Sequence, residues 1–493
     1  MRRVAGALAV VLLVAWISFG GGITEWANDG TYDYSSAIVV QNVSDRAAVV
    51  NVVYQTPCDP TTPDYQVTVP AGSSGLVNVN DAFPGPWSGS AIVTSDVPII
   101  ANQNYVWHVP YDGTQWAANE GGVLSPSTTW YLAEGSTYGG FESYVCVQNP
   151  SEQSAQVEIA YTTPGASHAG PAVSVDPVSS LEIPIKDTLT DYSSIGVVVT
   201  SDMPVVAQLS TYWNGGASYT STHGASQPAN TWYVAEGSTS SMSGFETWIT
   251  VQNPTPSPAD VSVTYIADGQ QIPGPQYTVA PMTHDTFNTA GTLPDQSNFA
   301  AMITSDQPIV AVQSMRWDGH QGFDSTTGVP QSQQTWHFPL VRPTLGASSW
   351  LAVQNVGDAS ATVTIDYVSE TGTTGGGTLD VDPFGRGSLS LPEEVGGSMW
   401  YSAVVTSDQP IVAMVGNHWE TSSGSHRDIG FGVSQTATQW YLPTTPHAPS
   451  WSESSFGESS APSTGTDDRD GDGVPDDQDM CPDYPGDPSM DGC

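Results

Sequence analysis

The segment Ile303–Ala311 reads ITSDQPIVA, and the chain repeats it almost unchanged at three other places. The copies are IVTSDVPIIA at Ile92–Ala101, VVTSDMPVVA at Val198–Ala207 and VVTSDQPIVA at Val404–Ala413. A phrase that returns at intervals of about 100 residues indicates a long internal repeat. Apolar β-branched residues on both sides of a polar segment with a proline predict a hairpin of two strands in each copy.

Other residues return with the same period. Five tryptophans lie about 104 residues apart, and four of them open the repeats while the fifth closes the array: Trp26, Trp130, Trp232, Trp336 and Trp440. After each opening tryptophan comes a strand that ends in Val-Gln-Asn, as at Val251–Asn253. The next segment alternates apolar and polar residues, as in Val261–Tyr265, which predicts a strand with one buried face.

Each repeat contains six or seven short strand patterns, with turn signals every 8–12 residues and no helical periodicity, which favours a β-sandwich. We therefore expect an all-β protein with four tandem Ig-like β-sandwich repeats of about 104 residues and a small calcium-stapled C-terminal segment. The expected boundaries are residues 23–128, 129–230, 231–334 and 335–443, the last including the closing Trp strand. A Ser/Thr/Pro linker is expected at 444–466.

A second architecture fits the same spacing. Each Val-Gln-Asn lies about half a period before the following Ser-Asp, so a large β-propeller with blades of about 50 residues remains an alternative. The spare strand at Trp440 distinguishes the two. In a string of sandwiches it would pair with the preceding domain, whereas in a propeller it would help to close the ring.

The charge balance argues against anionic partners. The chain has 9 Lys and Arg against 50 Asp and Glu, so the phosphate backbone of a nucleic acid or an anionic membrane surface would be repelled. Charged residues are nevertheless only 12% of the chain, and uncharged polar residues predominate among the rest, as in secreted β proteins.

The N-terminus indicates export. Two arginines precede an almost wholly apolar run from Val4 to Phe19, and small residues follow, which is the order of a signal peptide over residues 1–22. We expect a secreted, extracellular or cell-surface protein with no membrane span in the mature chain. An uncleaved N-terminal anchor is the alternative.

The repeats resemble a known group of sequences. WYLAEGST at Trp130–Thr137, WYVAEGST at Trp232–Thr239, the VQNP strands and the TSDxP segments are similar to tandem β-repeats of secreted bacterial surface proteins whose function is not established. The resemblance covers residues 26–443 and loses the AEGST phrase in the first and fourth repeats. It implies export and surface presentation, and it implies no reaction.

The acidic segment near the C-terminus has the spacing of a calcium loop. Oxygen ligands stand at positions 1, 3, 5, 7, 9 and 12 with glycine at position 6, which lets alternate residues of a tight loop point at one Ca²⁺. The candidate ligands are the side chains of Asp468, Asp470, Asp472 and Asp479, the carbonyl of Val474, and Asp476 directly or through water. Pro475 argues against a helix-flanked EF-hand.

The whole segment 467–493 resembles a thrombospondin type 3 repeat, a calcium-wrapped and disulfide-stapled module. Cys481 and Cys493 are close enough in sequence for a local bridge, and the resemblance implies that they pair. It also implies that nearby aspartates complete a second ion. Cys58 and Cys146 lie in different repeats and are expected to be buried thiols or a loop pair rather than a metal site.

No catalytic arrangement stands out. The nine histidines are scattered, and zinc, nucleophile-elbow and phosphate-loop motifs are missing from the sequence. The recurring Glu134 and Glu236 are expected in turns or interfaces rather than as a glycosidase pair. Four tryptophans fall outside the repeat register and are candidates for a glycan site: Trp87, Trp116, Trp400 and Trp451.

The sequence thus predicts a secreted or surface-bound structural or adhesive protein that is not an enzyme, with Ca²⁺ as its ligand and an extracellular protein or glycan as partner. The alternative is a secreted carbohydrate-binding protein, or less favoured, one that cleaves glycans.

Overall fold

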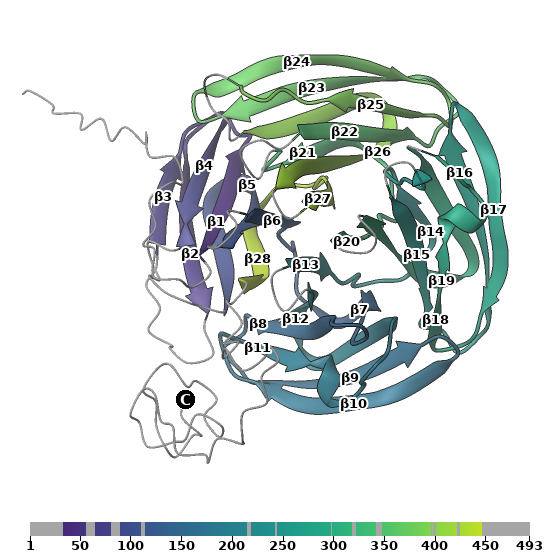
Figure 1. Ribbon diagram of the computed structural model, residues 1–493. Helices are drawn as coiled ribbons and strands as arrows, with labels where there is room; N and C mark the ends of the chain where they lie inside the picture. Colours follow the sequence, from purple (N-terminus) through teal and green to yellow (C-terminus); the bar gives the residue numbers. More distant parts are fainter. Residues whose placement is uncertain are drawn as a thin grey trace, which may run out of the picture.

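Four β-sheet modules form a closed ring in the computed structural model (Figure 1). It describes residues 33–55, 65–79, 89–109, 114–213, 218–241, 244–296, 298–317, 322–341, 348–395, 397, 401–421 and 424–445. These residues form strands, turns and short 3-10 helices, and no α-helix occurs among them. The expected signal peptide, calcium segment and nearly all of the linker lie outside the described residues.

The first two modules contain the following elements. Module 1 has β1 (Asp33–Asn42), β2 (Ala48–Gln55), β3 (Tyr65–Val69), β4 (Ser73–Asn78), β5 (Gly89–Val109) and β6 (Thr114–Gly121), together with β28 (Ala437–Thr445). Module 2 has β7 (Ser127–Gly135), β8 (Glu142–Asn149), β9 (Ala155–Thr163), β10 (Ala166–Val175), β11 (Ser179–Pro184), the 3-10 helix η2 (Ile185–Asp187), β12 (Ile195–Trp213) and β13 (Ser218–His223).

The other two modules repeat this order. Module 3 has β14 (Ala229–Val234), β15 (Glu246–Asn253), β16 (Ala259–Ala267), β17 (Gln270–Val279), β18 (Thr283–Asn288), the 3-10 helix η4 (Thr289–Gly291), β19 (Ala300–Trp317) and β20 (Gly322–Thr327). Module 4 has β21 (Gln333–Phe338), β22 (Ser348–Asn355), β23 (Ala361–Ser369), β24 (Gly372–Val381), β25 (Arg386–Ser390), β26 (Ser402–Thr421) and β27 (Gly424–Phe431).

One long strand organises each module. In module 2 the order is β10-β9-β12-β8-β11, and β7 and β13 also pair with β12. The first part of β12 pairs with β9 and β7, whereas the second part pairs with β8 and β13. All these pairs are antiparallel, and β5, β19 and β26 have the same place in modules 1, 3 and 4.

The long strand bends sharply at its middle. Gly135 pairs with the start of β12 at Ile195, and Ser143 pairs near its end at Thr211. The Ser136 N–H donates to Ser143 Oγ at 2.9 Å, so the partners of the two ends of β12 are in contact. The two ends of β12 therefore lie close together. The strand therefore folds back on itself and contributes its halves to two layers.

The bend is the repeated Thr-Ser-Asp-x-Pro phrase, so the expectation of a hairpin is wrong. The two apolar runs belong to one continuous strand and pair with other strands, not with each other. At this corner Asp306 Oδ1 accepts the Asp260 N–H at 2.8 Å, and Ser305 Oγ accepts the Gln307 N–H at 3.3 Å. Asp96, Asp202 and Asp408 make the equivalent bonds to Val49, Gln156 and Thr362.

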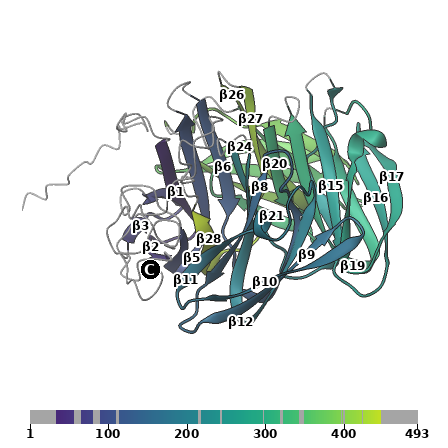
Figure 2. The ribbon, with the colours of Figure 1, turned by 60° about the horizontal axis from the view of Figure 1, so that its bottom comes forward.

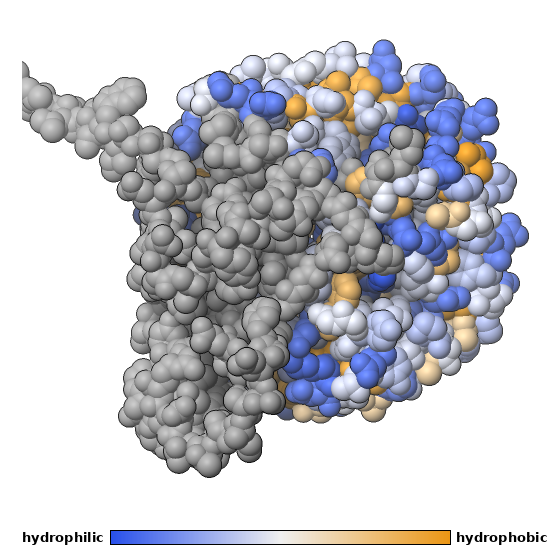
Figure 3. Space-filling model, in the orientation of Figure 1, coloured by the Kyte–Doolittle hydropathy of each residue, from blue (hydrophilic) through white to orange (hydrophobic). Residues whose placement is uncertain are grey.

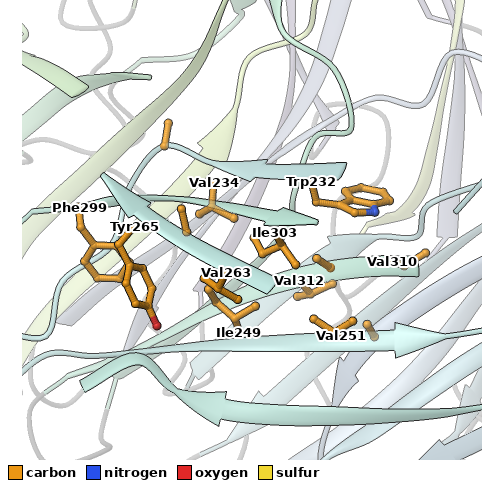
Figure 4. Packing of buried hydrophobic residues seen from close by; sticks show 14 of the residues in the cluster. Trp232, Val234, Ile249, Val251, Val263, Tyr265, Phe299, Ile303, Val310 and Val312 are labelled. Carbon is orange, nitrogen blue, oxygen red and sulfur yellow. The ribbon is translucent and has the colours of Figure 1, made fainter. Parts of the chain in front are cut away.

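Alternating strands supply the cores. The exposure of β9 and of β23 alternates between buried and exposed over their first residues, as the apolar and polar pattern predicts. Figure 4 shows the core of module 3, where Trp232 lies over Val310 and Ile303. The indole N–H of Trp232 donates to the Ile309 carbonyl at 2.7 Å, which satisfies its only polar atom inside the core.

Module 1 obtains its tryptophan strand from the other end of the chain. β28 pairs with β5 as β7 pairs with β12, and Trp440 pairs with Val93. Trp440 is fully buried in the core of module 1, and its indole N–H donates to the Ile99 carbonyl at 3.0 Å. β28, the last strand among the described residues, thus closes the ring.

The architecture differs from both expectations. The chain is all-β with four modules of about 100 residues, as predicted, but the modules form a ring rather than a string. The repeating unit of the ring is a whole module of seven strands, not a propeller blade of about 50 residues. The modules also depart from separate Ig-like sheets, because one bent strand belongs to both layers.

The modules follow one another head to tail. Figure 1 shows the outer strands β10, β17 and β24 along the circumference, and Figure 2 shows the same ring tilted. The turn after β9 in module 2 bridges to β18 of module 3 at Pro164 and His284. A hydrogen bond from a side chain joins module 4 to module 1, where Thr373 Oγ1 donates to the Gly72 carbonyl at 3.1 Å. We call these four junctions seams 1–2, 2–3, 3–4 and 4–1.

Candidate functional site

The calcium residues proposed from sequence lie outside the described part of the chain. This applies to Asp468, Asp470, Asp472, Val474, Asp476 and Asp479, and to Cys481, Cys493 and Cys58. In the described ranges, no three His, Cys, Asp or Glu side chains come together in a group that would hold a metal ion. Calcium binding therefore stays a prediction for the C-terminal segment alone.

The remaining sequence candidates are placed as follows. Cys146 is a buried thiol on β8, and its Sγ donates to Ser210 Oγ at 3.4 Å. Of the candidate glycan tryptophans, only Trp116 lies within the described residues, where the backbone of β6 places it opposite Trp107. Trp87, Trp400 and Trp451 fall outside them.

The four innermost strands surround the axis of the ring. β6, β13, β20 and β27 each contact the next one around the axis, so the inner circle is closed. A partly open cavity of about 400 Å³ lies among these strands and the adjoining ends of modules 3 and 4. Its polar lining includes Thr222, Asp324, Ser325, Asn417 and Asp428.

Asp324 ties three modules together at the cavity wall. Its carboxylate accepts the Thr220 hydroxyl of β13 at 2.6 Å and the Ile429 N–H of β27 at 2.7 Å. It is 7% exposed, so these bonds offset much of the cost of removing a charge from water. Asp428 occupies the equivalent register on β27 and accepts the Asn417 amide at 3.1 Å.

The inner strands are joined by further bonds from side chains to carbonyls. Thr222 Oγ1 donates to the Ser325 carbonyl at 2.9 Å, and Thr327 Oγ1 donates to the His223 carbonyl at 2.6 Å. His223 Nε2 contacts the Gly121 carbonyl of module 1. Hydrogen bonds between neighbouring modules therefore hold the cavity wall together.

A buried glutamine marks the seams. Gln252 Nε2 in the Val-Gln-Asn phrase of module 3 donates to the Val197 carbonyl of module 2 at 3.3 Å. Gln148 makes the same bond to Ala91 at seam 1–2, and Gln41 makes it to Ala403 at seam 4–1. The last contact is a second closure of the ring, independent of β28.

The two glutamates of the AEGST phrase lie at seams, as expected. Glu236 of module 3 forms an ion pair with Arg386 of module 4, and the two side chains are 2% and 8% exposed. Glu134 of module 2 accepts the Thr250 hydroxyl of module 3. Burial raises the pKa of Glu134, and the Thr250 hydrogen bond and the Arg316 charge oppose that shift only in part.

His284 is a seam residue that sequence reasoning missed. It is 1% exposed on β18 of module 3, and both ring nitrogens bond to hydroxyls of module 2. Nδ1 lies 2.9 Å from Thr162 Oγ1, and Nε2 lies 2.8 Å from Ser194 Oγ. Burial lowers the pKa of His284 to about 4, so the ring is neutral at physiological pH.

The sequence signal for these residues was a departure from the repeat. Asp324, Asp428 and His284 occupy positions that hold other residue types in the remaining modules, whereas the notable motifs were those repeated four times. A repeated residue serves folding in every module. A residue found at a repeat position in only one or two modules is the better indicator of a role specific to those modules.

Among known proteins, one family model matches part of the chain. A family described as a family of unknown function, DUF5719, matches residues 224–464, just under half of the chain. None of the curated proteins matches. No helix in the described residues is long and apolar enough to cross a membrane.

Three solved structures illustrate the structural similarities. Thermotoga maritima 1070 shares 17% identity at a TM-score of 0.19, with 21% of this chain and 94% of that chain covered. The Anabaena sensory rhodopsin transducer shares 23% at 0.15, with 17% and 92% covered. A tetra-tandem repeat from the extending region of a large adhesion protein shares 12% at 0.11, with 83% and 97% covered. These scores are too low to support an argument about this chain.

Proposed function

We propose that this protein is an exported structural or adhesive protein of the cell surface, in which the ring is a rigid platform and the C-terminal segment binds Ca²⁺. It performs no catalysis in this role. Its partner is an extracellular protein or glycan, and calcium binding supplies folding free energy to residues 467–493.

The observation that carries the proposal is the closure of the ring by β28. Asp33 at the start of β1 pairs with His108, and Thr445 at the end of β28 pairs with Gly89, so both described chain ends lie on β5 of module 1. The N-terminal and C-terminal segments therefore leave from one module. This arrangement suits a platform that is attached at one side and presents its other three modules.

The composition supports a role outside the cytoplasm. Residues 1–22 have the order of an export signal, and the chain has a formal net charge of −41 that keeps it soluble and away from anionic surfaces. Among the described residues visible in Figure 3, hydrophilic residues predominate and apolar residues occur in separate groups. That surface suits a protein whose binding is specific rather than generally hydrophobic.

Calcium titration of the full-length chain tests the role of the tail. We expect heat of binding and added order at Ca²⁺ concentrations of about 10⁻⁴–10⁻³ M, the range of extracellular calcium modules. Asp472→Ala should abolish both signals, and Asp358→Ala on an exposed turn of module 4 should leave them unchanged. Equal calcium responses in all three proteins would refute the calcium site.

Cell fractionation tests the location and the partner together. The wild-type protein should appear in the envelope or secreted fraction, and a pull-down with calcium should recover a partner that is lost with chelator or with Asp472→Ala. A protein that stays in the cytoplasm would contradict the surface role, whatever the outcome of the calcium titration.

The axial cavity favours a second candidate function, the binding of a small glycan. Buried carboxylate and amide groups at Asp324, Asp428 and Asn417 provide hydrogen-bond partners for sugar hydroxyls in a cavity of about 400 Å³. Asp428→Asn should reduce binding on a glycan array, with Asp358→Asn as the matched surface control. Glycan binding that survives Asp428→Asn would place the sugar elsewhere.

A further inference from the structure

We propose that seam 2–3 is an acid-labile joint, which opens the ring when His284 becomes protonated. The inference concerns a conformational response of the ring and is independent of the proposed surface role. It is based on the contacts of one histidine between two modules.

His284 is held across the seam by hydroxyl groups. Thr162 near the end of β9 and Ser194 before β12 belong to module 2, whereas His284 is the second residue of β18 in module 3. Gly196 of module 2 packs directly against the imidazole. A Cβ atom at this position would lie only 3.2 Å from His284 Nδ1. The imidazole of module 3 therefore occupies a close-fitting site made by module 2, and this site exists only while the seam is closed.

In the described part of the chain, no ionised group is hydrogen-bonded to the imidazole, and burial alone accounts for its lowered pKa. The elements packed against it present Thr162, Ser194 and the amide of Gln252, and the neighbouring Asp285 on its own strand is exposed to solvent. A proton on the buried ring would thus add a charge without a counterion, which is expensive in a site of low polarity. Opening the seam gives the imidazolium access to water.

A chain of hydroxyls connects His284 to the buried Glu134. Ser194 Oγ lies 3.1 Å from Thr286 Oγ1, which lies 2.9 Å from Thr250 Oγ1, and Thr250 donates to Glu134. While Glu134 is ionised its carboxylate only accepts, and in that state each hydroxyl donates toward it and His284 donates from Nε2. The same order leaves Nδ1 to accept the Thr162 hydroxyl, which requires a neutral imidazole.

The other seams lack this histidine. The position that pairs with the Gln of the Val-Gln-Asn phrase is Ser74 in module 1, Ser180 in module 2 and Arg386 in module 4. Ser74 bonds to Ser402 at seam 4–1, and Arg386 pairs with Glu236 at seam 3–4. Among these equivalent positions, only His284 has a side chain that can gain a proton as the pH falls from 6.5 to 4.

The direction of the effect follows from proton linkage. Burial lowers the pKa of His284 from 6.5 to about 4, so the open seam binds a proton more readily than the closed seam between these values. The contribution of His284 to the stability of the closed seam is complete above pH 6.5 and is lost as the pH falls toward 4. The opening constant at pH 5 should be about 30-fold larger than at pH 8 from this histidine alone. Glu134, whose pKa is raised, acts in the opposite direction because its neutral form favours the closed seam.

Hydrogen exchange of the full-length protein measures the opening locally. Amides at the end of β9 and in β18 should exchange faster at pH 5 than at pH 8, after correction for the intrinsic pH dependence of exchange. His284→Gln should remove about 30-fold of that change, and Glu134→Gln should retain the His284 response. His168→Gln is the matched control, because His168 lies partly exposed on the edge strand β10.

Histidine NMR of the wild-type protein gives a second readout that needs no variant. His284 should remain neutral down to about pH 4 while the ring is closed. A titration near pH 6.5, or an acid response of seam 2–3 that is equal in wild type and His284→Gln, would refute the proposal. Equal acid responses at all four seams would also refute it.

Discussion

At the scale of single residues, the fold depends on polar side chains that bond to the backbone at the same place in every module. Asn253 Nδ2 donates to the carbonyls of Ser257, Val279 and Ala280, and its Oδ1 accepts the Thr255 N–H. Asn42, Asn149 and Asn355 make the same set of bonds. A buried asparagine thus joins the turn after one strand to the end of another, which explains the repeated Val-Gln-Asn phrase.

Removing one of these side chains should be costly. Asn253→Ala leaves buried carbonyls without their donor, and we expect a loss of about 2–4 kcal/mol in the free energy of unfolding. Denaturant unfolding at neutral pH measures it. The control is Asn230→Ala, because Asn230 is exposed and donates one bond to the Ser305 carbonyl, so the loss there should stay below about 1 kcal/mol.

At the scale of elements, the decisive piece is β28. It completes module 1 with Trp440 and Leu442, both buried, and joins residues 341 positions apart through the bond from Trp440 to Ile99. The corresponding strands β7, β14 and β21 belong to the modules they open. Modules 2, 3 and 4 thus use a strand from the start of their own sequence at this place, whereas module 1 uses β28, which comes after module 4 in the chain. This exchange closes the ring.

Truncation of Trp440 should weaken that closure. Trp440→Ala creates a cavity in the core of module 1, and the expected loss of stability is about 3–5 kcal/mol. The amides of β5 should lose protection from hydrogen exchange before those of β19. Tyr138→Ala serves as the control, because Tyr138 is 59% exposed and fills no core. Equal protection of β5 in both variants would show that β28 does not hold module 1 closed.

At the scale of the whole molecule, four head-to-tail junctions close on themselves. A junction of this kind yields a ring when the rotation between units closes and an open filament when it does not. The contacts from Gln41 to Ala403 and from Ser74 to Ser402 show that the fourth junction is made. The glutamine bond recurs at three seams, but the residue that pairs with the glutamine differs from module to module, as Ser74, Ser180, His284 and Arg386.

Small-angle scattering tests the closed ring directly. A chain that ends at Thr445 should have a radius of gyration near 22 Å, as for a compact body of about 410 residues, whereas a linear string of four modules would be nearly twice as large. A chain that ends at Thr436 lacks β28 and should be more extended and more easily cleaved by protease. A rod-like profile for the longer chain would contradict the ring.

The sequence by itself determined the all-β class, the four-fold period, and the places of the recurring Trp and Val-Gln-Asn residues, because alternation, turn chemistry and repetition are local properties of a chain. It also placed Glu134 and Glu236 at turns or interfaces. It did not determine that the Ser-Asp-x-Pro phrase is a corner within one strand, since a bend and a hairpin share the same local residues.

Only the tertiary structure decided that β28 closes a ring and that His284, Asp324 and Asp428 lie where modules meet. The physical reason is distance along the chain. Strand pairing across hundreds of residues depends on which edges and carbonyls remain available after each module has folded, and no local pattern records that.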